Sequence, residues 1–246
     1  MHYVRKGMGE PLVLIHGFLG THRMFEKVID TLAKTFDVIA IDLPGHGKSP
    51  VSKDIQTVYD YAKEIVAFLQ ALDIDKATWI GHSLGGYIVY AATDRYSQHL
   101  TSAAAVYSTP EADDSVTKRQ RAISIQKIQK NGIAAFSEER IPSYFADDAN
   151  PEDVRFATEL AKETSVGGAI RAIGAMRDRP DQTEVLSGVQ LPFFILRGTK
   201  DQWDGNFHIA KPSKFVRFAE TNTSHMGMLD NPTEFIEVLQ EFLKGT

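Results

Sequence analysis

The chain contains 246 residues, 43% of them hydrophobic, and its 27 basic and 32 acidic side chains give a formal net charge of −5. This length allows one domain with a sizeable core, and the mixed, slightly acidic charge argues against nucleic acid as a partner. The chain has no cysteine, which excludes disulfides, thiolate metal sites and a cysteine nucleophile. No stretch is apolar for long enough to form a signal peptide or a membrane span, so we expect a cytoplasmic protein that does not associate with membranes.

Short, nearly continuous apolar runs alternate with amphipathic stretches along the N-terminal part of the chain, as in a parallel sheet wrapped by helices. In chain order, the expected strands are residues 11–15, 36–41, 77–80, 103–107, 193–196 and 214–218. Apolar residues at three-to-four spacing predict helices over residues 22–34, 55–72, 87–96 and 231–243. The pattern therefore predicts an α/β fold with a mostly parallel central sheet flanked by helices.

Residues 111–185 interrupt this alternation. They carry many charges and several helical patterns but no convincing buried strand. Because no long linker surrounds them, we expect a helical cap packed on the sheet rather than an independent domain. The core would then consist of residues 1–110 and 186–246.

The strongest chemical signal is the sequence Gly81-His82-Ser83-Leu84-Gly85, which follows a predicted buried strand and precedes a predicted helix. A serine on such a sharp strand-to-helix turn, a nucleophile elbow, exposes its hydroxyl, and the flanking glycines avoid clashes with neighbouring backbone. The turn also places the backbone N–H of Leu84 at a helix N-terminus, where an anion is favoured. We therefore predict that Ser83 is a nucleophile and that Leu84 contributes to an oxyanion hole.

A serine nucleophile needs a base and a group that orients the base. His225 lies just beyond the last predicted strand and Asp201 just beyond the preceding one, so both would reach the carboxyl edge of the sheet. Serine, aspartate and histidine in this chain order are typical of such a scaffold. Asp204 remains an alternative orienting residue, although Asp201 is nearer to the strand end.

The loop after the first strong strand is expected to supply the second oxyanion donor. In His16-Gly17-Phe18 the glycine permits a close backbone approach, and the N–H of Phe18 would point at the oxyanion beside that of Leu84. We expect His16 to shape this turn through side-chain hydrogen bonds and His82 to pack against the sheet.

Together these motifs resemble the α/β-hydrolase family, in particular its small, capped serine esterases and carbon–carbon hydrolases. The resemblance covers nearly the whole chain. It rests on H-G-F at 16–18, D-L-P-G-H-G-K-S at 42–49, G-H-S-L-G at 81–85, G-T-K-D at 198–201 and the late His225.

This resemblance implies an α/β-hydrolase fold whose helical cap is inserted after the sixth strand. It also implies a catalytic triad with Ser83 as nucleophile, His225 as general base and then acid, and Asp201 as the residue that orients the base. The amides of Phe18 and Leu84 would form the oxyanion hole.

We therefore expect a carboxylesterase-like hydrolase that cleaves small-molecule esters through an acyl-enzyme, with no cofactor and no metal. Two alternatives remain open. The same triad serves carbon–carbon bond hydrolases and a lyase of menaquinone synthesis, which act on carboxylate-bearing substrates. The fold alone also permits a non-catalytic, ligand-binding homologue. The expected partner is a small-molecule substrate, and the sequence does not determine the oligomeric state.

Substrate choice would depend mainly on the cap, although aromatic side chains in a helical insertion more often pack between domains than line a pocket. Candidate apolar walls are Leu19, Phe136, Tyr144, Phe145, Trp203 and Met226. One or two inward-facing arginines would favour a carboxylate-bearing substrate. The arginines of the predicted cap are Arg119, Arg121, Arg140, Arg155, Arg171, Arg177 and Arg179.

Overall fold

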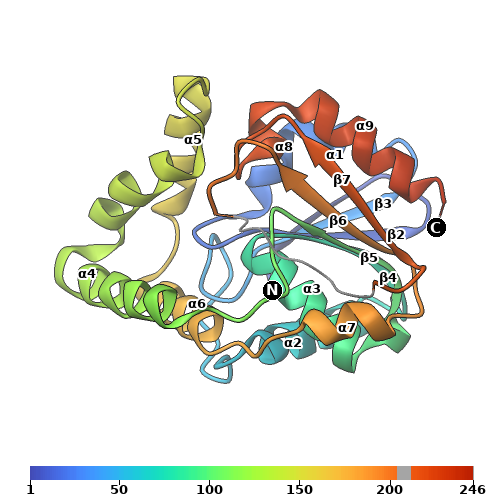
Figure 1. The fold of residues 1–246 in the computed structure, drawn as a ribbon, viewed down its shortest axis with the longest axis horizontal. Helices are drawn as coiled ribbons and strands as arrows, with labels where there is room; N and C mark the ends of the chain where they lie inside the picture. The colour runs from blue at the N-terminus through green and yellow to red at the C-terminus, as the bar shows by residue number, and fades with distance from the viewer. Residues whose placement is uncertain (204–211, 246) are drawn as a thin grey trace.

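The protein is represented by a computed structural model that describes residues 1–203 and 212–245. Within these residues, seven strands form one sheet in the order β1-β3-β2-β4-β5-β6-β7 (Figure 1). They are β1 (Tyr3–Lys6), β2 (Pro11–Ile15), β3 (Asp37–Ile41), β4 (Ala77–His82), β5 (Leu100–Val106), β6 (Phe193–Gly198) and β7 (Val216–Thr221). Only the pairing of β1 with β3 is antiparallel among the described strands, which confirms the predicted mostly parallel sheet.

Two strands differ from the sequence-based expectation. β1 is not predicted, because it is a largely exposed edge strand with two charged residues and lacks the apolar run of a central strand. β7, the opposite edge strand, ends at Thr221 rather than Phe218. Most of its residues are at least partly exposed, so hydrophobicity marks its limits poorly.

Helices cover both faces of the sheet (Figure 1): α1, α8 and α9 lie on one face, and α2, α3 and α7 on the other. Their bounds are α1 (Glu26–Leu32), α2 (Val58–Gln70), α3 (Leu84–Arg95), α7 (Thr183–Gly188), α8 (Gly227–Asp230) and α9 (Pro232–Leu243). Short 3-10 turns are η1 (His22–Phe25) and η2 (Ser97–His99). α2 starts at a reciprocal capping box between Thr57 and Asp60, and α9 starts at a proline after Asn231, so local sequence sets both starts.

The chain between β5 and β6 is helical and projects beside the sheet (Figure 1). Besides α7 it contains α4 (Ser115–Arg140), η3 (Ile141–Tyr144), α5 (Pro151–Ala161) and α6 (Val166–Arg177). α4 is broken at Gly132, whose φ of 80° lies outside the helical region. The expectation that this segment follows a sixth strand is corrected: a single strand, β1, precedes β2, so the segment follows the fifth described strand.

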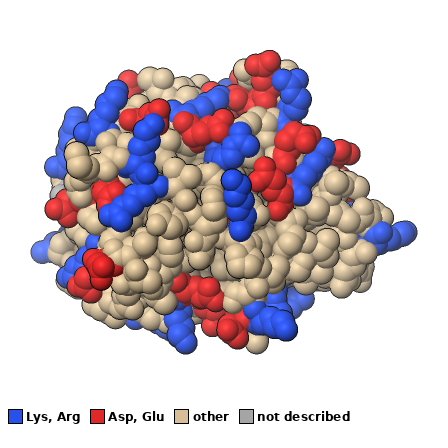
Figure 2. Space-filling model, turned by 180° about the vertical axis from the view of Figure 1, so that it is seen from behind, with Lys and Arg blue, Asp and Glu red and all other residues tan. Residues whose placement is uncertain are grey.

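The surface agrees with the mixed composition. On the face shown in Figure 2, basic and acidic side chains are interspersed rather than gathered into a basic stripe. No helix within the described residues combines the length and the hydropathy needed to cross a membrane.

Candidate active site

Ser83 lies at the junction of β4 and α3, where the backbone turns sharply. Its φ of 52° and ψ of −112° are strained for a non-glycine residue, at a cost of about 1–3 kcal/mol. The turn brings two backbone segments so close that a Cβ on Gly81 would overlap the carbonyl group of Gly85. Glycine at position 81 is therefore required by this close approach, and the turn presents Ser83 at the carboxyl end of a buried strand.

His225 and Asp201 are brought together by neighbouring parallel strands, since Asp201 follows β6 and His225 follows β7. The Nδ1 atom of His225 lies 2.7 Å from Oδ2 of Asp201. The Asp201 side chain is fully buried and that of His225 is 6% exposed. In the tautomer whose Nδ1–H donates to this carboxylate, Nε2 carries no proton and can accept one. Asp204, the alternative to Asp201, lies outside the described residues.

Ser83 and His225 line the same cavity, which has a volume of about 440 Å³. Phe18, Tyr144 and Trp203 also line it. A volume of this size is within the range of small-molecule sites. The predicted nucleophile and the predicted base therefore share a cavity whose walls include residues of the helical segment.

The loop after β2 lies against Ser83. A Cβ on Gly17 would come within 2.7 Å of Nδ1 of His82 and within 3.1 Å of Cβ of Ser83, so only glycine allows this approach. The backbone N–H groups of Phe18 and Leu84 have no hydrogen-bond acceptor among the described residues. Both donors are therefore available to an external acceptor.

His16 holds this loop in place through both of its ring nitrogens. Its Nδ1–H donates to the carbonyl oxygen of Gly17 at 2.7 Å, and its Nε2 accepts from the N–H of Leu43 at 2.9 Å. The ring of His46 lies 5.2 Å from that of His16. Burial lowers the pKa of His16 to about 4 and that of His46 to about 3. Both rings are therefore neutral at physiological pH.

These buried imidazoles predict acid sensitivity of the fold. Between the ordinary pKa of 6.5 and about 4, the unfolded chain binds protons at His16 and His46 that the folded chain does not bind. We therefore expect the free energy of unfolding to fall as pH is lowered through this window, by up to about 1.4 kcal/mol per pH unit for each histidine. Urea denaturation at pH 7, 6 and 5 measures this loss. Burial also holds the pKa of His82 well below its usual value, so His82 contributes in the same direction. His46→Met removes one of these titrating groups and should make the pH dependence shallower, whereas an unchanged slope would contradict the assignment.

Part of the predicted apolar wall is found at the cavity. Tyr144 and Trp203 line it, and Phe136 lines a second cavity of about 40 Å³ that shares these two residues. The indole N–H of Trp203 donates to the carbonyl oxygen of Ser143 at 2.8 Å, and the Tyr144 ring lies 5.3 Å from that of His225. η3 thus places aromatic surface beside the predicted base.

The remaining predicted wall residues, Leu19, Phe145 and Met226, line neither cavity and are buried. Leu19 is fully buried, and its backbone adopts a φ of 64°, a conformation that its position in the sequence does not reveal. Conversely, the cavity has lining residues that sequence reasoning did not single out as pocket residues: Tyr87, Thr109, Glu111, Ala112, Asp113, Asp114, Thr117, Met176 and Gln202. Arg121 and Arg179 also line it, and these are the inward-facing arginines that the sequence left open.

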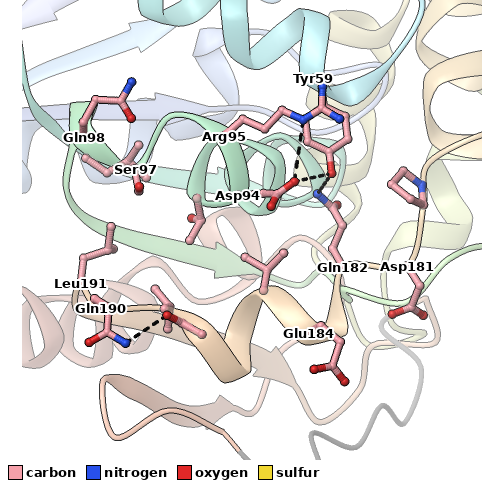
Figure 3. A pocket seen from close by; sticks show the side chains of 16 residues that line it. Tyr59, Asp94, Arg95, Ser97, Gln98, Asp181, Gln182, Glu184, Gln190 and Leu191 are labelled. Carbon is pink, nitrogen blue, oxygen red and sulfur yellow. Dashed lines mark hydrogen bonds and ion pairs between the residues drawn. The ribbon is translucent and has the colours of Figure 1, made fainter.

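A larger cavity of about 930 Å³ lies beside α7 and the C-terminal end of α3 (Figure 3). Its polar side chains bind one another: the Tyr59 hydroxyl donates to Asp94 at 2.9 Å, and Gln182 donates to that hydroxyl at 3.3 Å. Of the described lining residues, none is a predicted catalytic residue. Size alone therefore does not make this cavity the reaction site.

Among the described residues, His2, His22 and Asp42 bring their donor atoms within 4.8 Å of one another, as in a metal site. Each imidazole Nδ1 lies 2.8 Å from the Asp42 carboxylate, and the N–H of Lys48 also donates to it. Burial raises the pKa of Asp42, but hydrogen bonds from His22 and Lys48 outweigh it and hold that pKa well below its usual range. These hydrogen bonds explain why the Asp42 carboxylate can be buried. The three residues come from separate segments, so their spacing in the sequence does not reveal the group.

Comparisons with known proteins bear on the family and the fold. The family described as alpha/beta hydrolase fold matches residues 10–232. Over 96% of this chain and 89% of the relative, the chain is 26% identical to 3-oxoadipate enol-lactonase 1 of Acinetobacter baylyi. It is 28% identical to 2-(acetamidomethylene)succinate hydrolase of Mesorhizobium japonicum, over 85% of this chain and 77% of the relative.

A solved structure with a similar fold is that of a thermophilic esterase from Thermogutta terrifontis with malate bound. The TM-score is 0.93, the sequence identity is 23%, and the match covers 99% of this chain and 93% of the other. At this identity the likeness concerns the fold.

Proposed function

Because the chain belongs to the α/β-hydrolase family, we propose that it is a serine hydrolase that cleaves small-molecule carboxylic esters through an acyl-enzyme. The observation that carries the proposal is the strained Ser83 in one cavity with His225, whose Nδ1 is held by buried Asp201. Residues 111–185 act as the cap over this cavity. The names of the relatives, an enol-lactonase and an esterase among them, support acyl transfer from an ester or lactone.

In the proposed reaction, Ser83 Oγ attacks the ester carbonyl while Nε2 of His225 takes the serine proton. The N–H groups of Phe18 and Leu84 bind the developing oxyanion, and each such donor contributes about 2.7–4 kcal/mol to transition-state stabilisation. His225 then passes the proton to the leaving alcohol. Water repeats these steps on the acyl-enzyme and releases the acid. Asp201 keeps the imidazole in the productive tautomer and stabilises the imidazolium.

The test is hydrolysis of a 4-nitrophenyl ester series from acetate to decanoate, together with labelling by a fluorophosphonate. We expect turnover that falls as the acyl chain lengthens, because a cavity of about 440 Å³ excludes long chains. We also expect a covalent fluorophosphonate adduct on the peptide that contains Ser83, detected by mass spectrometry. A protein that neither turns over an ester nor forms the adduct would contradict the proposal and favour the non-catalytic, ligand-binding alternative.

A second candidate function is cleavage of a carbon–carbon bond, or the related lyase reaction, on a carboxylate-bearing substrate. The observation that favours it is the presence of Arg121 and Arg179 in the cavity. This second reaction would use the same Ser83 and His225. Labelling of Ser83 without turnover of any ester in the series would favour this second candidate over the esterase.

A further inference from the structure

The cavity that contains Ser83 carries positive charge on the side formed by the helical segment. Arg121 from α4 and Arg179 from the turn after α6 both line it. Both guanidinium groups contact the carboxylate of Asp113, which is itself buried. The three side chains form a cluster of two cations and one anion, so one positive charge of the cluster is not neutralised within it.

Arg179 is occupied by the protein itself. Besides Asp113, its guanidinium donates to the carbonyl oxygens of Met176 at 2.8 Å and Glu111 at 2.6 Å. Its guanidinium carbon also lies 3.9 Å from the centre of the Tyr87 ring. The Arg179 residue is only 4% exposed. These contacts use most of the Arg179 donors, leaving only its buried Nε without a hydrogen-bond partner among the described residues, and they place Arg179 as a fixed positive charge beside Asp113.

Arg121 is held differently. Its Nε donates to Oδ2 of Asp113 at 3.0 Å, which fixes the direction of the guanidinium group. Its two Nη atoms have no hydrogen-bond partner among the described residues, and the side chain is 20% exposed. Arg121 also lines the small adjoining cavity with Arg140. Two parallel N–H donors with no partner are the arrangement that binds a carboxylate in bidentate fashion.

The other charged groups at this cavity do not cancel the positive charge of Arg121. Glu111 and Asp114 border the cavity but are exposed, and the Asp114 carboxylate accepts the N–H of Thr117 at the start of α4. Exposed carboxylates are screened by water far more than the buried cluster is. On the other side, Arg140 lies over the Trp203 ring with its guanidinium carbon 5.0 Å from the ring centre.

We propose that Arg121, oriented by Asp113 and Arg179, binds a free carboxylate of the substrate. The natural substrate is then a small ester or lactone that carries a carboxylate besides the bond to be cleaved. This inference rests on the proposed serine hydrolase function and adds the substrate class to it. The aromatic surface of Tyr144 and Trp203 would cover the carbon skeleton between the two groups.

Two matched pairs of substrates test the inference. One pair carries the carboxylate on the acyl side of the ester, and the other carries it on the alcohol side. The acyl-side pair is mono-4-nitrophenyl adipate and its methyl ester, and the alcohol-side pair is 4-acetoxybenzoate and its methyl ester. In at least one pair we expect the free acid to have a kcat/KM about 10- to 100-fold above that of its methyl ester, as charge-assisted hydrogen bonds give. Arg121→Gln should lower this ratio at least tenfold, and Arg121→Lys should retain part of it.

Arg119→Gln is the matched control, because Arg119 lies on the same helix but is exposed and borders neither cavity. It should leave the ratio unchanged. A ratio near one in both pairs for the wild type, or a ratio that Arg121→Gln does not change, would overturn the inference while serine-dependent ester hydrolysis stands.

A binding measurement separates this inference from the proposed catalysis. In the Ser83→Ala background, adipate should raise the melting temperature more than dimethyl adipate does at equal ionic strength, and Arg121→Gln should abolish the difference. This readout needs no turnover. Equal shifts from the two ligands would contradict carboxylate binding even in a protein that hydrolyses no ester.

Discussion

The Ser83→Ala protein is expected to hydrolyse its ester substrates at least about 10⁴-fold more slowly than the wild type, measured as kcat. The reason is that alanine has no atom to form the acyl-enzyme, so only substrate binding and the oxyanion donors remain. Binding of substrate should change much less than kcat, because the N–H groups of Phe18 and Leu84 and the cavity walls stay in place. Initial rates of 4-nitrophenyl acetate hydrolysis, with kcat and KM determined separately, give the result.

Ser97→Ala is a suitable control for this substitution. Ser97 is exposed and borders the larger cavity beside α3 and α7, away from His225. The activity of the Ser97→Ala protein should equal that of the wild type. Circular dichroism and thermal denaturation must show that the Ser83→Ala protein is folded, because Ser83 occupies a strained backbone position. A folded Ser83→Ala protein that keeps a tenth or more of the activity would rule out Ser83 as the nucleophile.

Asp201→Asn is expected to lower kcat/KM by about 10³- to 10⁴-fold near neutral pH, the size of effect known for the corresponding change in other triads. Asparagine is nearly isosteric, but its amide N–H₂ donates to Nδ1 of His225 and so favours the proton on Nε2. That tautomer cannot accept the proton of Ser83. The neutral amide also no longer stabilises the imidazolium in a site where Asp201 is fully buried. Steady-state kinetics from pH 6 to 10 test this, because alkaline pH should not restore wild-type activity.

Two further variants make the result specific. Asp148→Asn removes an exposed carboxylate that pairs with Lys200 and should leave activity unchanged. Asp204→Asn tests the alternative orienting residue. If Asp204→Asn caused the large loss and Asp201→Asn did not, the assignment of the orienting residue would pass to Asp204.

Hydrophobic patterning predicts six of the seven described strands, because a strand buried on both faces must be apolar along most of its length. The central strands are predicted to within a few residues, as with residues 36–41 for β3 and 77–80 for β4. The pattern fails at the sheet edges. β1 is missed and the end of β7 is misplaced, since an exposed edge strand tolerates charged residues.

The candidate catalytic residues could be predicted because each belongs to a short motif at the end of a predicted strand. Once those strands are parallel neighbours, Ser83, Asp201 and His225 reach the same edge without further information. The two turns that support them also depend on local backbone geometry, since a side chain at Gly17 or Gly81 would collide with neighbouring segments. The triad itself is a proposal that rests on these motifs and on the 2.7 Å distance between Nδ1 of His225 and Oδ2 of Asp201.

The walls of the cavity depend instead on contacts between distant parts of the chain. Leu19 and Met226 have the apolar character of pocket residues, yet both are buried in the hydrophobic core. Arg121 is one of seven arginines in the helical segment, and nothing in its sequence neighbourhood distinguishes it from Arg119. It faces the cavity because of the way α4 packs, and Asp113 and Arg179 fix its direction.

By itself, then, the sequence determined the fold class, the order of the central strands along the chain and the residues that are candidates for chemistry. These follow from periodicity and from motifs a few residues long, in which backbone geometry is set locally. Only the tertiary structure decided which arginine presents two unpartnered Nη donors at the cavity, and that His2, His22 and Asp42 meet. The physical reason is that the direction of a side chain and the burial of a charge are set by packing between segments far apart in the chain.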